Sequence, residues 1–289
     1  MTVFRDYQGV RLVASEATVL EELEEHLDHP IPNVMEFDRD EDEVEEQDYW
    51  FHFIVENDHV VELALEIQGL SSLPASIVTL GNLRRLILAC NDLQSLPDKL
   101  GQLQSLKHLD LSQNQLRMLP DSIGQLTNLQ SLDLSTNQLA FLPNSIGQLQ
   151  SLRRLLLQNN QLASLPDTIG LLQNLKELYL SRNQLQSLPD SIGQLQSLQE
   201  LDLNHNQLDT SLTNLKPLLW AATRNKIFKE HIPSQLFSHP IVHPLAPYSL
   251  DYQSNSLCPF CGTMGLVTGR VKKTGEDRSF CPECENIIP

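Results

Sequence analysis

Residues 106–128 read LKHLDLSQNQLRMLPDSIGQLTN, and residues 129–151 read LQSLDLSTNQLAFLPNSIGQLQS. The two stretches share their 23-residue length, their leucines, and one asparagine, proline and glycine at matching places. Extending the comparison outward gives seven consecutive units, which begin at residues 60, 83, 106, 129, 152, 175 and 198. A tandem repeat of this length predicts a solenoid in which each unit buries one face against its neighbours.

Leucine fills positions 4 and 6 of every unit, from Leu63 to Leu201 and from Leu65 to Leu203. This alternation predicts a short strand whose positions 4 and 6 point inward while positions 3, 5 and 7 point outward. Position 9 is Gln68 and then asparagine in six units, where an amide can satisfy buried backbone groups and bridge to the next turn. We therefore expect an α/β solenoid, an arc with a concave parallel sheet and bulkier return segments outside.

The unit LxxLxLxxNxLxxLPxxIGxLxx resembles the leucine-rich repeats of intracellular Ras-group and related prokaryotic proteins, over residues 60–208. The resemblance implies a non-enzymatic arc that binds proteins, in several members tied to small Ras-like GTPases. It does not extend to residues 1–59 or 209–289, so the identity of the partner is not implied.

The predicted domains are residues 1–59 (acidic N-terminal region), 60–208 (repeats), 209–232 (C-terminal cap), 233–257 (proline-rich connector) and 258–289 (zinc ribbon). In the first region, apolar residues at helical spacing predict a helix over Ala17–Asp28, with Ser15 as its N-cap. Alternating apolar residues from Trp50 to Val55 predict a hairpin that covers the first unit.

Acidic residues are concentrated in the N-terminal region. The chain has 37 acidic and 20 basic residues, for a net charge of −17, and residues 1–59 hold 18 of the acids against three bases. Nine acids in Glu36–Asp48 predict a solvated loop, with a docking tail for a basic partner as the alternative. A negative surface opposes binding to a phosphate backbone, so nucleic acid is not expected as a general ligand.

The sequence also bears on location. No stretch approaches the roughly 20 apolar residues that a membrane span needs. The first residues lack the basic and apolar segments of a secretory signal. We therefore expect a cytoplasmic protein without membrane contact.

The concave face is the expected binding site, because positions 3, 5, 7 and 8 should be free of the packing constraint. Charged and aromatic residues gather in these columns, and such residues anchor protein interfaces. The predicted partner-binding residues are Arg85, His108, Asp110, Asp133, Arg154, Leu156, Tyr179, Arg182, Asp202 and His205. Tyr179 is the first expected anchor, within an apolar patch that it forms with Leu156.

Two features of this face could indicate a catalytic site. Asp110 and Asp133 should be neighbours across strands, and paired carboxylates can act in acid–base catalysis. An open arc offers no water-excluded pocket, however, so we expect no catalytic residues and no enzymatic activity. Cys90 lies in the column of position 8 and is interpreted as a small semi-buried filler rather than a nucleophile.

Four of the five cysteines form two closely spaced pairs near the C-terminus. The pairs are Cys258 with Cys261 and Cys281 with Cys284. Two such turns can place four thiolates around one zinc ion at about 2.3 Å, which closes the coordination sphere and makes the metal structural. A thiol-redox pair does not explain the second copy. Ligation by His239 or His243 is a further alternative. With a hairpin expected between the pairs, the segment resembles a zinc ribbon.

The leading hypothesis is a cytoplasmic adaptor whose repeats bind one protein. The alternative is a nucleic-acid-linked regulator, in which the zinc ribbon contacts RNA or DNA while the repeats recruit a protein. An enzyme is not expected, because the sequence has no phosphate loop, nucleophile elbow or open metal site.

Overall fold

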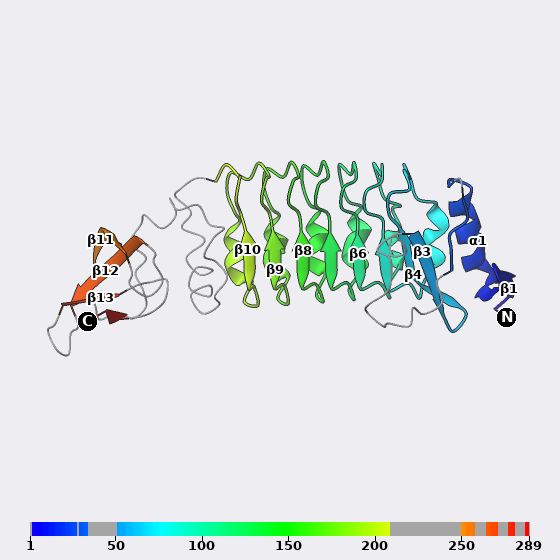
Figure 1. Cartoon of the computed structure of the whole chain (residues 1–289), viewed down its shortest axis with the longest axis horizontal. Helices are drawn as coiled ribbons and strands as arrows, with labels where there is room; N and C mark the ends of the chain where they lie inside the picture. Colours follow the sequence, from blue (N-terminus) through cyan, green and yellow to red (C-terminus); the bar gives the residue numbers. More distant parts are fainter. Residues whose placement is uncertain are drawn as a thin grey trace.

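The computed structural model describes residues 2–27, 29–33, 51–208, 250–257, 264–270, 277–280 and 287–288. Residues 51–208 form one continuous row of coils in which the strands of successive units lie side by side (Figure 1). The repeats are therefore a solenoid with a parallel sheet, as the sequence predicts.

The strands of the repeats form a parallel sheet with one antiparallel hairpin at its N-terminal edge. Among the described residues this sheet has eight strands, and strands that are consecutive in sequence are neighbours in space. They are β3 (Phe51–Glu56), β4 (His59–Leu65), β5 (Arg85–Ile87), β6 (His108–Asp110), β7 (Ser131–Asp133), β8 (Arg154–Leu156), β9 (Glu177–Tyr179) and β10 (Glu200–Asp202). Only β3 and β4 pair in antiparallel fashion within this sheet. The register follows the unit length, so that Leu109 lies opposite Leu132.

The hydrophobic core runs along the inner side of this sheet. The leucines at positions 4 and 6 are at most 2% exposed in every unit. Complete burial of a leucine side chain stabilises a fold by about 1.5–3 kcal/mol relative to exposure. Because each unit contributes only one layer, the core exists only where units stack.

The asparagines of position 9 form a ladder of hydrogen bonds beneath the leucines. Asn137 Oδ1 accepts the backbone N–H of Leu116 at 2.9 Å, and its Nδ2 donates to the carbonyl of Leu111 at 2.9 Å. Asn114 and Asn160 make the equivalent bonds. Each amide thus reaches back to the preceding unit, whereas the sequence suggested a bridge to the next one.

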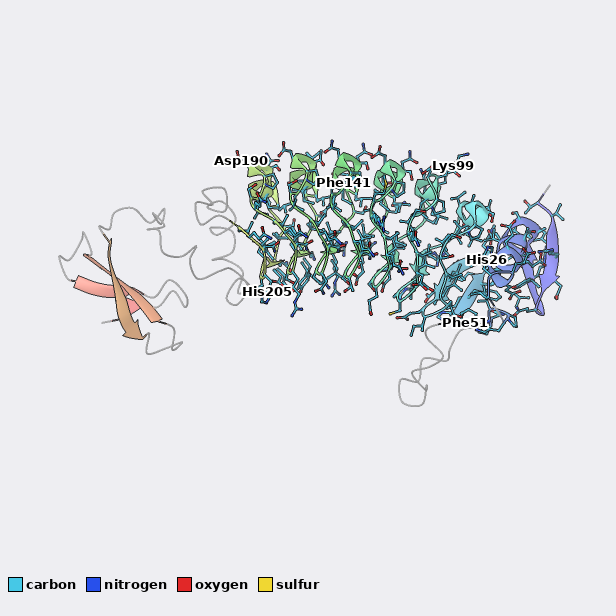
Figure 2. The ribbon with its side chains drawn as sticks, turned by 90° about the horizontal axis from the view of Figure 1, so that it is seen from above. His26, Phe51, Lys99, Phe141, Asp190 and His205 are labelled. Carbon is cyan, nitrogen blue, oxygen red and sulfur yellow. The ribbon has the colours of Figure 1, made fainter. Side chains whose placement is uncertain are left out.

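Short 3₁₀ helices form the return segments. They are η2 (Ala75–Thr79), η3 (Leu100–Gln102), η4 (Asp121–Gln125), η5 (Asn144–Gln148), η6 (Asp167–Leu171) and η7 (Asp190–Gln194). Apart from η3, each begins directly after a proline, which has no N–H to leave unpaired. A Cβ on Gly124 would stand 2.4 Å from the carbonyl oxygen of Ser145, so this position requires glycine. Figure 2 shows Lys99 and Asp190 on the edge of these helices and His205 on the opposite, strand edge.

A hairpin and a helix cover the N-terminal end of the repeats (Figure 1). They comprise β1 (Phe4–Tyr7), antiparallel to β2 (Val10–Val13), and α1 (Ala14–Glu24). Leu20 of α1 is fully buried in the same core as the repeats. Glu16 is 2% exposed, and its carboxylate accepts the N–H of Val60 and contacts His59 Nδ1, each at 2.7 Å. This carboxylate ties the helix to the β3–β4 hairpin.

The helix differs from the sequence prediction. It starts at Ala14 instead of Ala17, Val13 occupies the N-cap, and no side chain caps the end, so the assignment of Ser15 as N-cap is wrong. The physical reason is that the Ala14 N–H already donates to the carbonyl of Val3 at 2.8 Å. The β1–β2 hairpin was not expected from the sequence.

The described residues after 249 form a separate antiparallel sheet. Its strands, in spatial order, are β11 (Leu250–Leu257), β12 (Met264–Arg270), β13 (Asp277–Phe280) and β14 (Ile287–Ile288). The antiparallel pairing of β12 with β13 agrees with the hairpin expected between the two cysteine pairs. β11 lies within the segment 233–257 that the sequence assigned to a connector. The expected acidic loop and C-terminal cap lie outside the described residues.

Candidate functional site

The outward side of the repeat sheet is the candidate site, and we call it the strand face. It is formed by positions 3 and 5 of the seven units, because the middle residue of each short strand points into the core. Position 3 holds Glu62, Arg85, His108, Ser131, Arg154, Glu177 and Glu200, and position 5 holds Ala64, Ile87, Asp110, Asp133, Leu156, Tyr179 and Asp202. The parallel register aligns each column across the sheet.

A hollow of about 250 Å³ lies on the strand face over β5 to β8. It is lined by Arg85, Leu86, Ile87, His108, Leu109, Asp110, Ser131, Asp133, Arg154 and Leu156. Six of the ten predicted partner-binding residues therefore share one depression. The other four, Tyr179, Arg182, Asp202 and His205, belong to later units and do not line it.

The two arginines of the hollow are paired with glutamates. Arg154 Nε lies 3.1 Å from Glu177 Oε2, and Arg85 Nε lies 3.7 Å from Glu62 Oε2. His52 Nε2 also contacts Glu62, at 3.4 Å. Burial acts to raise the pKa of Glu62, but the hydrogen bond from His52 and the positive charge of Arg85 outweigh it and lower that pKa.

The aspartates of position 5 have a local structural role that the sequence analysis missed. Asp110 Oδ1 accepts the N–H of Ser112 at 2.9 Å, and Asp133 Oδ1 accepts that of Ser135 at 2.8 Å. Such bonds to a backbone two residues ahead are typical of aspartate in turns. The Asp-Leu-Ser spacing of both units could have revealed them.

The environment of the hollow perturbs two titratable groups. Burial and the charge of Asp110 raise the pKa of Asp133, against hydrogen bonds from Ser135 and the charge of Arg154. Burial and the charge of Arg85 lower the pKa of His108. His108 is therefore neutral near pH 7 and does not offset the aspartates.

The expected apolar patch is smaller than predicted. Leu156 is only 8% exposed, so it offers less surface than the sequence suggested. The hydroxyl of Tyr179 donates a hydrogen bond to Glu200. This bond, together with burial and nearby carboxylates, raises the pKa of Tyr179 to about 12. The tyrosine ring, and not its hydroxyl, remains for a partner.

The columns of positions 7 and 8 differ from expectation. Ser112 and Ser135 at position 7 are each 8% exposed, so this column is not free of packing constraints. Position 8 has a left-handed backbone in every unit, with φ between 53° and 60°, including Arg182 and His205. At Cys90 in this column, burial, Glu66 and Asp110 raise the thiol pKa, which disfavours the thiolate that a nucleophile requires.

The predicted zinc ligands Cys258, Cys261, Cys281 and Cys284 lie outside the described residues. Within the described ranges, no group of three or more histidine, cysteine or acidic residues is placed to hold a metal ion. No helix in the described part of the chain is long and apolar enough to cross a bilayer.

One family model matches part of the repeats. Residues 81–139 and 150–208 match the family model described as leucine rich repeat. No curated protein matches the chain.

Several solved structures are similar to part of this chain. A leucine-rich-repeat protein of Leptospira interrogans is 37% identical with a TM-score of 0.56; the match covers 63% of this chain and 47% of that one. This chain thus spans about half the length of that relative. The leucine-rich-repeat domain of a type III effector is 32% identical with a TM-score of 0.46, covering 51% of this chain and 52% of that one. A pollen receptor kinase is 29% identical with a TM-score of 0.48, covering 56% and 81% respectively.

Proposed function

We propose that residues 60–208, which are a leucine-rich-repeat solenoid, bind a protein partner through the strand face and catalyse no reaction. Leucine-rich-repeat domains are typically non-enzymatic protein-interaction modules. The observation that carries the proposal is the difference between columns of the same repeat. Interior positions are the same residue in nearly every unit, whereas positions 3 and 5 change from unit to unit.

The strand face has the composition of a binding surface. It combines arginine and tyrosine side chains with a central hollow, and these residue types recur at the energetic centres of interfaces. The strands hold their backbone fixed, so little ordering is required when a partner docks. This makes a rigid, preformed site.

Site-specific crosslinking of the full chain tests this proposal. A photo-crosslinking residue replaces Ser131, in the hollow, or Leu171, which is 50% exposed on η6. We expect a defined protein to crosslink from position 131 and not from position 171. Equal crosslinking from both positions, or crosslinking from 171 alone, would show that the strand face is not the binding surface.

Alanine variants then locate the anchors. Tyr179→Ala and Arg154→Ala should each weaken the crosslinked partner's affinity by about 2 kcal/mol, the size typical of an interface anchor. Circular dichroism should remain unchanged, because neither side chain is part of the core. Unchanged affinity in both variants would remove these residues from the site.

The partner class and location are finer proposals. The resemblance to Ras-group repeats suggests a small Ras-like GTPase in the cytoplasm. A GTPase partner would bind differently in its GTP-analogue and GDP forms, which titration calorimetry can measure. Equal affinity for both forms would argue against a nucleotide-switched complex.

We also propose that Cys258, Cys261, Cys281 and Cys284 bind one structural zinc ion. The pairs occur in the connections that follow β11 and β13. In an antiparallel sheet of order β11-β12-β13-β14, the C-terminal ends of β11 and β13 lie at the same end of the sheet. Four thiolates suit zinc and leave no position for a substrate, so the metal would supply folding energy.

Elemental analysis of the full chain tests the zinc site. We expect one equivalent of zinc, lost in Cys258→Ser and retained in the control Cys90→Ser. Loss of zinc in Cys90→Ser, or no zinc in the unmodified chain, would contradict the assignment.

A further inference from the structure

The centre of the strand face is a row of four side chains with an ordered chemical pattern. Ile87, Asp110, Asp133 and Leu156 lie opposite one another across β5 to β8. All four line the hollow. Neighbouring parallel strands are about 4.8 Å apart. The two adjacent carboxylates are therefore flanked by the apolar side chains of Ile87 and Leu156.

Carboxylates outnumber guanidinium groups when the hollow and the glutamates paired with its arginines are taken together. Arg85 and Arg154 at its ends each have a glutamate partner. Asp110 Oδ1 accepts the N–H of Ser112, and Asp133 accepts hydrogen bonds from the N–H and the side chain of Ser135, all of which are uncharged donors. No ion pair in the described part of the chain involves either aspartate. With Glu62 and Glu177 counted, four carboxylates stand against two guanidinium groups, so the net charge of the hollow and these paired glutamates is negative.

The two aspartates also oppose one another. Burial and Asp110 raise the pKa of Asp133, which means that its ionised form is disfavoured in the free protein. A cation placed between the carboxylates would remove this repulsion. Neutral His108 does not supply that charge.

The size of the hollow limits its occupant. Its volume is about 250 Å³. This lies below the range of about 300–1,000 Å³ typical of small-molecule pockets. It suits one long side chain, whose methylene stem can contact Ile87 and the small exposed part of Leu156.

From this row we propose that the protein partner inserts one arginine or lysine side chain into the hollow, with its charged end on Asp110 and Asp133. This inference rests on the proposed function and names the chemistry of the partner. An anionic ligand, such as a phosphorylated residue, would have to separate both arginines from their glutamates and approach two carboxylates. The observations favour the cation.

Nuclear magnetic resonance of the full chain tests the proposal with short peptides as probes. The probe is acetyl-Leu-Arg-Leu-amide, and the matched neutral control replaces arginine with citrulline, which has almost the same shape. The amides of Ser112 and Ser135 report directly, because they donate to the two aspartates. The amide of Asn204, which donates to Asp202 at 3.0 Å outside the hollow, is the internal control.

We expect the arginine peptide to shift the Ser112 and Ser135 amides in a saturable manner and to leave Asn204 unchanged. The citrulline peptide should bind about tenfold more weakly, since it lacks the charge. The double variant Asp110→Asn with Asp133→Asn should lose the preference for arginine, while Asp202→Asn should keep it. Asparagine preserves the Oδ1 acceptor, so these variants retain the fold.

Three results would overturn the inference. These are equal shifts with both peptides, a preference for a phosphoserine peptide that depends on Arg85 and Arg154, or retained arginine preference in the double variant. If crosslinking from position 131 succeeds while the peptide test fails, the strand face binds a partner of another chemistry. If crosslinking from position 131 fails, the proposed function itself fails.

Discussion

The inner and outer sides of one repeat use polar side chains in different ways. On the inner side, Asn137 bonds one backbone N–H through Oδ1, and its Nδ2 lies within hydrogen-bond distance of three carbonyls, those of Leu111, Leu134 and Ser135. On the strand face, the hydrogen bonds that Asp133 accepts come from Ser135, two residues ahead in its own unit. The inner amide thus joins two units, whereas the outer carboxylate bonds within one unit.

This difference explains which columns vary. A side chain whose donors and acceptors all meet buried backbone cannot change without orphaning those groups. A side chain with one local bond can change at little cost, as the sequence of position 5 from Ile87 to Tyr179 shows. A position that varies between units is thus one with few internal contacts. Such positions form the surface that is available to bind a partner.

The largest expected effect comes from breaking the inner ladder. Asn137→Ala should lower the free energy of unfolding by about 4 kcal/mol, because the buried N–H of Leu116 and the carbonyl of Leu111 lose their partner. Denaturant unfolding measures the loss. The control is Ser131→Ala on the strand face of the same unit, which should stay within about 0.5 kcal/mol. A loss below that of the control would refute the ladder's role.

A second test extends the comparison to the return segments. Gly124→Ala places a Cβ 2.4 Å from the backbone oxygen of Ser145, and the overpacking should cost about 2–3 kcal/mol. Gly81→Ala is the control, since the nearest atom to a Cβ there is 4.0 Å away. Thermal unfolding of the two variants should differ clearly. Equal melting temperatures would show that the return segments shift freely.

Much of the solenoid could be predicted because periodicity constrains it strongly. Leucines at a fixed interval can share one core only if successive units stack in register, and Leu109 does lie opposite Leu132. The asparagine column follows from the need to satisfy a buried turn. The hollow, by contrast, depends on which side chains meet across four strands. The sequence therefore indicated six of its residues but not where the hollow begins and ends.

The parts that sequence missed are local and lack a strong residue signature. Position 8 has a left-handed backbone but holds no glycine in any unit. Residues such as Ile67 and Thr136 rarely adopt a positive φ, so nothing in the sequence indicated this conformation. The burial of Leu156 depends on neighbours from other units. The start of α1 was displaced because Val3, distant from the helical pattern, supplies the first hydrogen bond.

The left-handed column offers a smaller, stabilising test on the boundary between the two sides. Thr136 has φ 55°, which is costly for a β-branched residue, while the next unit has Asn159 at φ 58°. Thr136→Asn should raise the free energy of unfolding by about 0.5–1 kcal/mol, because asparagine tolerates this region. The reciprocal variant Asn159→Thr should lose a similar amount. Changes of the same sign in both variants would contradict this account.

The smallest expected effect concerns the carboxylate of Asp133. Asp133→Asn keeps the acceptor for Ser135 but removes a partly buried charge that repels Asp110. It should raise stability at pH 7 by at most about 0.5 kcal/mol.

The pH dependence gives this last test its sign. Because the folded state raises the pKa of Asp133, it binds the proton more readily than the unfolded chain does. The ionised carboxylate therefore lowers the free energy of unfolding at pH values above the raised pKa. This loss fades as the pH falls through that pKa toward the ordinary value of about 4. The advantage of Asp133→Asn, measured by urea unfolding at each pH, should shrink on acidification. An advantage that grows in acid would mean that the carboxylate stabilises the empty strand face.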